Sequence, residues 1–230
     1  MTGTEFARRV QNALEPRRNG AQAEPMARYM KDRFPFLGLK RPELDELLRP
    51  LWPEVKPHAT AKLLSTAAQD LWKLPEREYH YAAIDLLGRN RKALAAESLG
   101  LLRKLLESKS WWDSVDGITS VVVGPLVASH PELKVEMDLW SRDENFWVRR
   151  AAIIHQLAYR HKTDAARLFR YCASNAQDPE FFIRKAIGWA LRHYARTDPD
   201  AVRDFVEQHP ELSPLSKREA LKHLSGAAGK

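Results

Sequence analysis

The sequence predicts an all-α protein built from stacked helical repeats. No segment of the 230 residues shows the sustained alternation of apolar and polar residues that is typical of half-buried strands. Apolar residues recur instead at the helical period along the whole chain. Similar residues also recur about 35 positions apart, a spacing typical of stacked helix pairs.

The helical period is clearest in residues 60–72. This segment places five small or apolar side chains on one face: Ala61, Leu64, Ala68, Leu71 and Trp72. Residues 81–87 and 99–106 are shorter stretches of the same kind. Proline is tolerated in the first turn of a helix, where its missing N–H would have had no partner. We therefore expect helices to start near Pro42, Pro75, Pro131, Pro179, Pro199 and Pro214.

The repeat is clearest in the second half of the chain. A shift of about 35 residues aligns Asp143 with Asp178, Phe146 with Phe181, Arg149 with Arg184, Arg150 with Lys185, Ala151 with Ala186, and Tyr159 with Tyr194. The same shift backwards from Ala151 reaches Asp116 and then Tyr81, and the small residues Ala82, Ala151 and Ala186 would let helices approach closely. We predict a single domain over residues 1–230, with residues 1–20 as an N-terminal cap helix and 225–230 as a flexible tail.

Composition favours a polyanionic partner. The chain has 37 Lys and Arg against 30 Asp and Glu, a formal charge of +7, and nucleic acid is the commonest polyanion that such a protein meets. Cys172 is the only cysteine, which excludes an intramolecular disulfide and fits a packed thiol in a reducing cytosol. The start of the chain does not resemble a secretory signal, and the longest apolar run, near residues 121–128, is too short to span a membrane. We expect a cytoplasmic protein.

The sequence offers no pattern for a metal or a cofactor. The eight histidines are scattered without an HxxxH pair, and a single cysteine cannot complete a zinc site. No glycine-rich phosphate loop and no GxSxG motif are present. We expect no cofactor and no metal.

Chemistry-bearing residues gather first in the segment SWWDSVDG, residues 110–117. Trp112 and Asp116 lie four residues apart and share a helix face, whereas Trp111 would point into the core. Ser110 is expected to cap the helix. The alternative is that both tryptophans pack in the core and the aspartates are first-turn charges that suit the helix dipole.

The next two repeats add cations at corresponding positions. Arg149 and Arg150 begin one inner helix, and at least one of them must face solvent or a groove. Lys185, Trp189 and Arg192 form an i, i+4, i+7 series on another helix. An aromatic ring between two cations suits a surface that meets phosphates and sugars, although it could also decorate an exposed face through cation–π contacts.

Three functions fit these residues. The first is an enzyme acting on nucleic acid, with Asp116 as its carboxylate. The second is a DNA-binding solenoid without activity, and the third is a protein-binding scaffold, the commonest use of helical solenoids. The series Lys185, Trp189 and Arg192 argues against the scaffold, and only the pairing of Asp116 with Trp112 favours the enzyme over the binder.

Several segments resemble one family, the bacterial AlkD-type DNA glycosylases. The strongest are KSWWDSVD (109–116) and FFIRKAIGW (181–189), supported by EPMARYMK, LWKLPEREY, RRAAI and PLSKREALKH. The resemblance implies a right-handed α-solenoid of HEAT-like repeats with a basic concave groove. It also implies a monomeric, monofunctional DNA glycosylase of base excision repair that removes cationic alkylated purines, such as 3-methyladenine and 7-methylguanine, from duplex DNA without fully extruding the base.

The resemblance also implies roles for particular residues. Trp112, Asp116 and Trp189 would form the active site. Tyr29, Arg150 and Arg192 would be supporting DNA contacts. Beyond what the resemblance implies, we also expect Arg149, Lys185, Lys217 and Arg218 to contact DNA.

One carboxylate is enough for this chemistry. Glycosidases acting on neutral leaving groups need a general acid as well, but an N-alkylated purine is already positively charged and leaves as a neutral base. The remaining demand is a negative charge beside an oxocarbenium-like sugar and a positioned water, which Asp116 could supply. Tryptophans beside it would exclude bulk water and strengthen that interaction.

Overall fold

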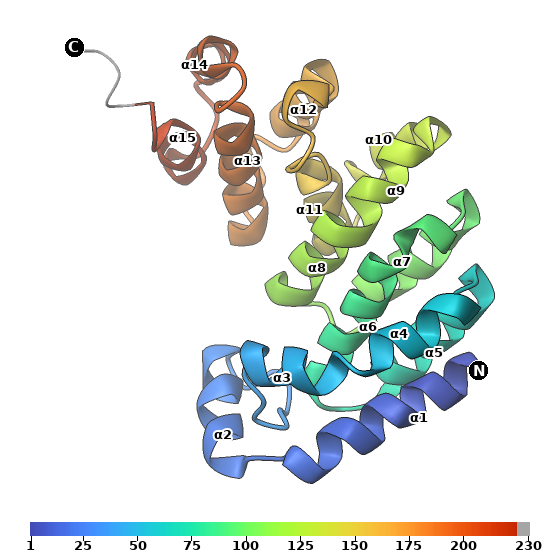
Figure 1. The fold of residues 1–230 in the computed structure, drawn as a ribbon. Helices are drawn as coiled ribbons and strands as arrows, with labels where there is room; N and C mark the ends of the chain where they lie inside the picture. The colour runs from blue at the N-terminus through green and yellow to red at the C-terminus, as the bar shows by residue number, and fades with distance from the viewer. Residues whose placement is uncertain (225–230) are drawn as a thin grey trace. The chain divides into compact units, whose positions relative to one another are not determined.

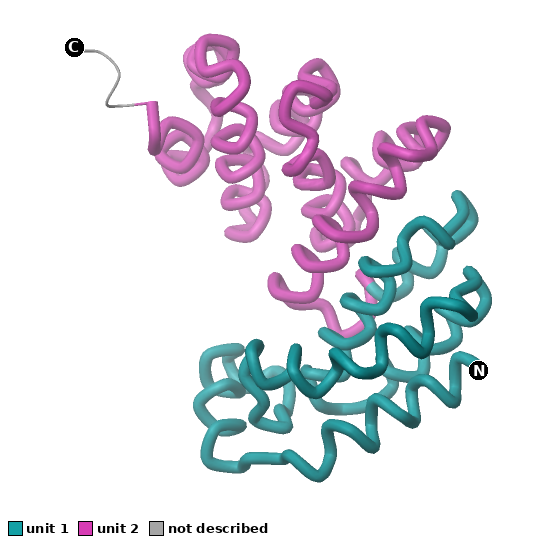
Figure 2. Tube along the Cα trace, viewed as in Figure 1, with its two compact units in different colours: residues 1–105 teal, residues 106–230 magenta. Residues whose placement is uncertain are grey.

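The protein is all-helical, as the sequence predicts (Figure 1). The computed structural model describes residues 1–224, and no strand occurs among them. The predicted tail, residues 225–230, lies outside the described residues. The chain divides into two compact units, Met1–Leu105 and Leu106–Lys230 (Figure 2), and each is described by itself. The single domain over residues 1–230 stays a prediction.

The first unit is organised around α1, which packs on α5, while α5 packs on α6. Its helices are α1 (Gly3–Leu14), α2 (Gly20–Tyr29), α3 (Arg41–Leu48), α4 (Leu51–Val55), α5 (Ala61–Lys73) and α6 (Arg77–Arg89), and the chain leaves the unit within α7 (Leu99–Glu107). A capping box between Thr2 and Glu5 starts α1, and the Thr60 hydroxyl caps α5. Leu64, Ala68, Leu71 and Trp72 are buried, which confirms the predicted face of α5.

The predicted N-terminal cap, residues 1–20, is more than one helix. Helix α1 ends at Leu14, a 3₁₀ turn follows over Glu15–Arg17, and α2 begins at Gly20.

The second unit consists of two helical layers. Helices α8 (Trp112–Ile118), α11 (Phe146–Ile154), α13 (Phe181–Tyr194) and α15 (Pro214–Leu221) follow one another in one layer, each in contact with the next. Helices α10 (Lys134–Trp140), α12 (Ala165–Ser174) and α14 (Pro199–Gln208) pack against this layer, and α9 (Gly124–Ser129) leads into α10 (Figure 1). Consecutive helices from alternate layers therefore form the stacked pairs that the repeat predicts.

The repeat is visible as identical contacts in two successive turns before α11 and α13. The Asp143 carboxylate accepts from the backbone N–H of Asn145, and the Asp178 carboxylate accepts from that of Glu180. Arg149 donates to the carbonyl of Asp143, and Arg184 donates in the same way to that of Asp178. Asn145 and Glu180 then cap their helices two residues further on. The sequence repeat is thus a repeat of hydrogen bonds.

Only some of the prolines start helices as predicted. Pro42, Pro199 and Pro214 lie in the first turns of α3, α14 and α15. Pro131 starts a 3₁₀ turn, and Pro75 and Pro179 stand two residues before α6 and α13. The caps of those two helices are Glu76 and Glu180, so the prolines fix the loop that precedes each helix.

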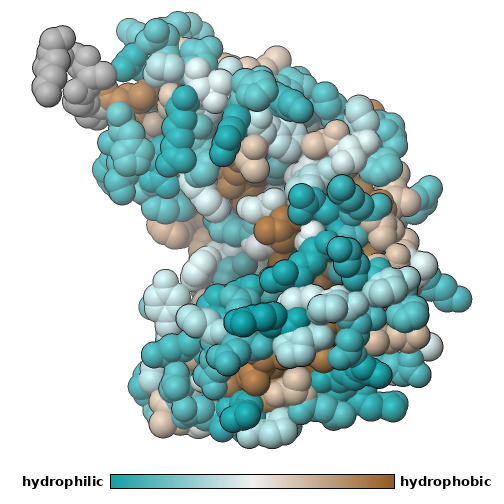
Figure 3. Space-filling view, in the orientation of Figure 1, coloured by the Kyte–Doolittle hydropathy of each residue, from teal (hydrophilic) through white to brown (hydrophobic). Residues whose placement is uncertain are grey.

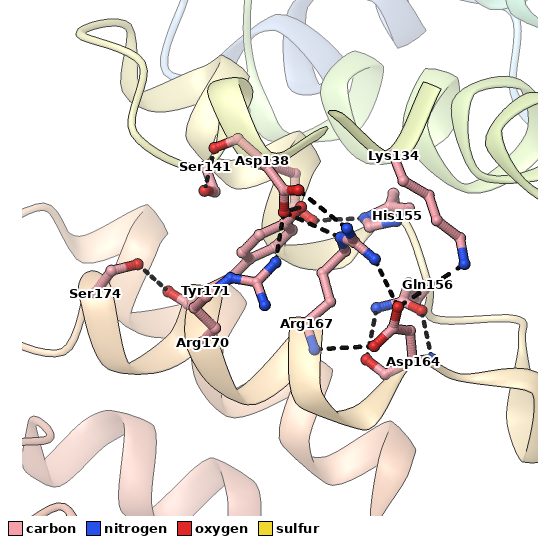
Figure 4. A network of polar contacts seen from close by, with 11 residues as sticks. Lys134, Asp138, Ser141, His155, Gln156, Asp164, Arg167, Arg170, Tyr171 and Ser174 are labelled. Carbon is pink, nitrogen blue, oxygen red and sulfur yellow. Dashed lines mark hydrogen bonds and ion pairs between the residues drawn. The ribbon is translucent and has the colours of Figure 1, made fainter. Parts of the chain in front are cut away.

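A polar network ties α10 to α12 (Figure 4). The Asp138 carboxylate accepts from Arg167 at 3.0 Å, from Arg170 at 2.6 Å and from the Tyr171 hydroxyl at 2.8 Å. Hydrogen bonding to Arg167, above all, holds the pKa of Asp138 well below its ordinary range. These ion pairs and the Tyr171 hydrogen bond therefore hold α10 and α12 together.

Apolar packing completes the second unit. Ala151, Ala186 and Cys172 are fully buried, which confirms the predicted close helix approach and the packed thiol, and burial raises the pKa of Cys172.

Figure 3 shows a face of the molecule that is largely hydrophilic, with hydrophobic residues in small patches. Among the described residues, no helix has the length and apolar character needed to cross a membrane.

Candidate active site

Helix α8 carries Trp112 and Asp116 on one face. The helix begins at Trp112 after the extended residue Trp111, and no side chain caps it. The predicted cap by Ser110 is wrong, because the Ser110 hydroxyl donates backwards to the carbonyl of Leu106 at 2.5 Å. After Ile118 the backbone widens into a π-helical turn over Thr119–Val123, a feature that often accompanies functional sites.

The structure brings the three predicted active-site residues together in one cleft of the second unit. The cleft has a volume of ≈ 350 Å³, and its walls come from α8, α11 and α13. Its lining residues are Trp112, Asp116, Arg150, Phe181, Phe182, Lys185, Trp189 and Arg192. Below, we call it the catalytic cleft, after the function that we propose for it. Asp116 is the only carboxylate among these lining residues.

Arg150 holds Asp116 through two parallel hydrogen bonds. Its Nε lies 2.7 Å from one carboxylate oxygen and its Nη2 lies 2.8 Å from the other. A third donor, Nη1, reaches the carbonyl of Phe182 at 2.5 Å. The Arg150 side chain is only 4% exposed and that of Asp116 is 16% exposed. Arg150 is therefore buried against Asp116, where the sequence suggested a cation facing phosphates.

Burial and pairing act on Asp116 in opposite directions. Loss of hydration raises its pKa above the ordinary value of 3.8, and the nearby charge of Asp113 raises it further. The hydrogen bonds and the positive charge of Arg150 lower it. The raising effects prevail, so the pocket holds a carboxylate of increased proton affinity whose orientation is fixed by a planar fork.

Glu219 is a site residue that the sequence reasoning missed. Its carboxylate accepts hydrogen bonds from Nζ of Lys185 at 2.7 Å and from Nη1 of Arg192 at 2.6 Å. The hydrogen bond from Lys185, above all, lowers the pKa of Glu219. Glu219 lies on α15 and is itself buried. Two of the predicted DNA-contacting cations thus share one carboxylate. The period could have found it, because Lys185 and Glu219 are 34 residues apart, as are Asp116 and Arg150.

Aromatic rings back the cleft. Phe182 packs against Trp111 at 5.1 Å and Trp147 at 4.8 Å between ring centroids, and its carbonyl is the third partner of Arg150. Trp111 is half-buried in this cluster, where the sequence predicts a core residue. Phe181, by contrast, is 56% exposed at the cleft. The cluster gives Arg150 a rigid, apolar support.

The remaining predicted DNA contacts lie elsewhere. Arg149 bonds to Asp178 at 2.7 Å and to two carbonyls, so it secures the turns before α11 and α13. Lys217 donates to the carbonyl of Pro210, and Arg218 is exposed on α15. Tyr29 belongs to the first unit and is 70% exposed. Their contacts with DNA stay predictions.

The described residues form no cluster of side chains that could bind a metal ion. Within residues 1–224, no three His, Cys, Asp or Glu side chains gather closely enough to hold an ion.

Comparison with known proteins identifies the family. The family model described as DNA alkylation repair enzyme matches residues 10–224. A solved structure, the predicted DNA alkylation repair enzyme from Enterococcus faecalis, is similar with a TM-score of 0.85 and 36% identity, covering 91% of this chain and 98% of that one. No curated protein matches. A family match of this extent supports a role in the repair of alkylated DNA: the chain belongs to the DNA alkylation repair enzyme family.

Proposed function

We propose that this protein is a monofunctional DNA glycosylase that hydrolyses the N-glycosidic bond of cationic alkylated purines in duplex DNA. The substrates would include 3-methyladenine and 7-methylguanine. The observation that carries the proposal is a single oriented carboxylate, Asp116, in a cleft that Trp112 and Trp189 also line. In this proposal the protein acts as a monomer. We expect the protein to act on chromosomal DNA in the cytosol.

The proposed reaction breaks the bond between C1′ of deoxyribose and the purine nitrogen. The electron pair of that bond goes to the purine, which is already cationic and leaves as a neutral base. Positive charge then develops on the sugar, where the Asp116 carboxylate stabilises it. Water adds to C1′ and loses a proton to Asp116 or to solvent, leaving an abasic sugar. No general acid is needed, which agrees with the lack of a second carboxylate in the cleft lining.

Arg150 serves this chemistry as a positioning residue. A buried carboxylate alone would take up a proton and lose the charge that the sugar requires. The bidentate pair opposes protonation and leaves each carboxylate oxygen with further lone pairs toward the cleft. The partial exposure of Asp116 supports its access to a bound sugar, whereas Arg150 lies beneath it.

Release of free methylated purine from alkylated duplex DNA tests the proposal. The native protein should release these bases, and Asp116→Asn, which keeps the size of the side chain, should be roughly a hundredfold to a thousandfold slower because one electrostatic contact is lost. Binding to undamaged duplex should change little in this variant. The matched control is Asp113→Asn, since Asp113 lies on the same helix but outside the cleft lining.

Two results would contradict the proposal. If native protein binds alkylated duplex without releasing bases, the chain is a binding module. If Asp116→Asn is fully active while Asp113→Asn is inactive, the assignment of the carboxylate is wrong.

A further inference from the structure

A second cleft lies beside the catalytic cleft, and Trp189 lines both of them. It has a volume of ≈ 660 Å³ and belongs wholly to the second unit. Ser120 lies in the π-helical turn that follows α8, Leu157 lies in the turn that follows α11, and His193 lies in the last turn of α13. The second cleft therefore lies near the C-terminal ends of α8, α11 and α13, the helices that also line the catalytic cleft. Below, we call it the flanking cleft.

The two clefts differ in how their cations are balanced. In the catalytic cleft, Arg150 is paired with Asp116, and Lys185 and Arg192 share Glu219. In the flanking cleft, Arg160 and Arg196 are both exposed, and neither has an ion pair with any carboxylate of residues 1–224. No Asp or Glu lines this cleft. The flanking cleft therefore carries positive charge that no carboxylate lining the cleft offsets.

The backbone at Arg160 points to the same place. Arg160 has a φ of 54°, the left-handed conformation that glycine or asparagine adopts at lower cost. A strained residue that carries a long charged side chain into a cleft is a candidate for function.

Apart from the two arginines, the described residues that line the flanking cleft are neutral or apolar, which suits a sugar. His193 has a lowered pKa, chiefly through burial and then through Arg196, so its ring is neutral at pH 7. Ile153, Leu157 and Ala190 supply apolar surface in the same cleft.

We propose that the flanking cleft binds the phosphodiester next to the nucleotide held in the catalytic cleft, with Arg160 and Arg196 as the phosphate ligands. The guanidinium groups would hold the phosphate oxygens, and the adjoining sugar would lie on the apolar wall beside Trp189. The inference rests on the proposed function in taking duplex DNA as the ligand. The inference also assigns more of the electrostatic attraction for DNA to Arg160 and Arg196. Glu219 already neutralises part of the charge of Lys185 and Arg192.

The test compares two substitution sets by their binding to undamaged duplex DNA over a range of salt concentrations. The double variant Arg160→Asn/Arg196→Gln removes both charges, and asparagine tolerates the left-handed backbone at position 160. The matched control is Arg142→Ala, an exposed arginine of the second unit that lines a different cleft. The double variant should lose about two units of the salt slope and about tenfold or more of its affinity at 0.1 M salt. Arg142→Ala should leave both unchanged.

Base release separates this inference from the proposed function. With saturating enzyme in a single turnover, the double variant should match the native rate, since neither arginine lines the catalytic cleft. Arg196→Lys should recover most of the slope contributed by that position. An unchanged salt slope in the double variant, or an equal loss in Arg142→Ala, would overturn the inference. If the slope falls as expected while native protein releases no base, the proposed function fails and the phosphate site stands.

Discussion

Asp116 is largely buried, but the proposed reaction requires its ionised form. The rate of base release should therefore depend on pH. Its carboxylate is the form that stabilises a cationic sugar, and burial raises its pKa above 3.8. Base release, measured as kcat/KM, should therefore fall as the pH drops through this raised pKa, so the acid limb lies above the ordinary range of an aspartate. Because its pKa is raised in the folded state, ionised Asp116 costs folding free energy at neutral pH, and pairing with Arg150 offsets only part of this cost.

Asp113 offers a way to move that limb without touching the cleft. Its negative charge contributes to the raised pKa of Asp116, so Asp113→Asn should shift the acid limb to lower pH while the rate at neutral pH stays close to native. The pH profile of single-turnover base release measures the shift, with Asp200→Asn on α14 as the control for loss of a distant carboxylate. Identical limbs in the native protein and Asp113→Asn would contradict the predicted action of the Asp113 charge on the titrating carboxylate.

The sequence predicts residue types at this scale better than it predicts their partners. Trp112, Asp116 and Trp189 follow from helix faces and the resemblance, and they do line one cleft. The pairing of Arg150 with Asp116, and of Lys185 and Arg192 with Glu219, was not predicted, because each pair joins neighbouring helices. A search for opposite charges one repeat apart would have proposed Asp116 with Arg150 and Lys185 with Glu219.

At the scale of elements, Gly188 sets the approach of α13 to α15. A Cβ at this position would lie 2.5 Å from the Cβ of Glu219 and 3.0 Å from the carbonyl oxygen of Ser216. The Ser216 hydroxyl in turn donates to the carbonyl of Arg184. The two helices are thus in backbone contact where Glu219 meets Lys185 and Arg192, and only glycine allows this contact.

Gly188→Ala should therefore separate these helices. We expect a loss of about 1–3 kcal/mol in the free energy of unfolding, since the neighbouring atoms are backbone and a Cβ that cannot rotate away. Gly100→Ala on α7 is the control, because a Cβ there meets nothing within 4 Å, and it should stabilise by about 0.4–1 kcal/mol. Urea unfolding followed by circular dichroism measures both, and equal stability of the two variants would contradict the close packing.

Helix boundaries show what a periodic pattern leaves open at this scale. The pattern predicts the buried face of α5, and the structure confirms it. The predicted Ser110 cap at the start of α8 is wrong, because serine suits both a cap and the hydrogen bond back to Leu106 that the structure shows. Local preference alone does not choose between these two bonds, since the choice depends on how α7 ends.

At the scale of the whole molecule, a formal charge of +7 predicts a polyanion but not where it binds. Many of the cations form ion pairs within the fold. Arg167 and Arg170 pair with Asp138, and Arg149 pairs with Asp178. The positive charge available to a polyanion is therefore smaller than the composition suggests, and it comes from the cations that no carboxylate pairs. The all-α fold was predictable because period and repeat are properties of the whole chain.

The chemistry proposed for this family member requires no Lewis acid. A cationic purine leaves without further activation, and the described residues offer no cluster of metal ligands. Treatment with a chelator should leave the rate of methylated base release unchanged within error. Activity that is lost to the chelator and restored by zinc or magnesium would contradict this mechanism.

The π-helical turn Thr119–Val123 bears on how this part of the chain can change in length. A π turn holds one more residue than the α-helical turn it replaces, and here it stands between Asp116 and Gly124, whose carbonyl accepts from the Tyr159 hydroxyl. Loss of one residue from the turn would convert it to ordinary α-helix while the flanking segments kept their partners. We therefore expect the chain to tolerate deletion of Val121, which is exposed in the middle of the turn, whereas a deletion within α13 would rotate Trp189 away from Asp116.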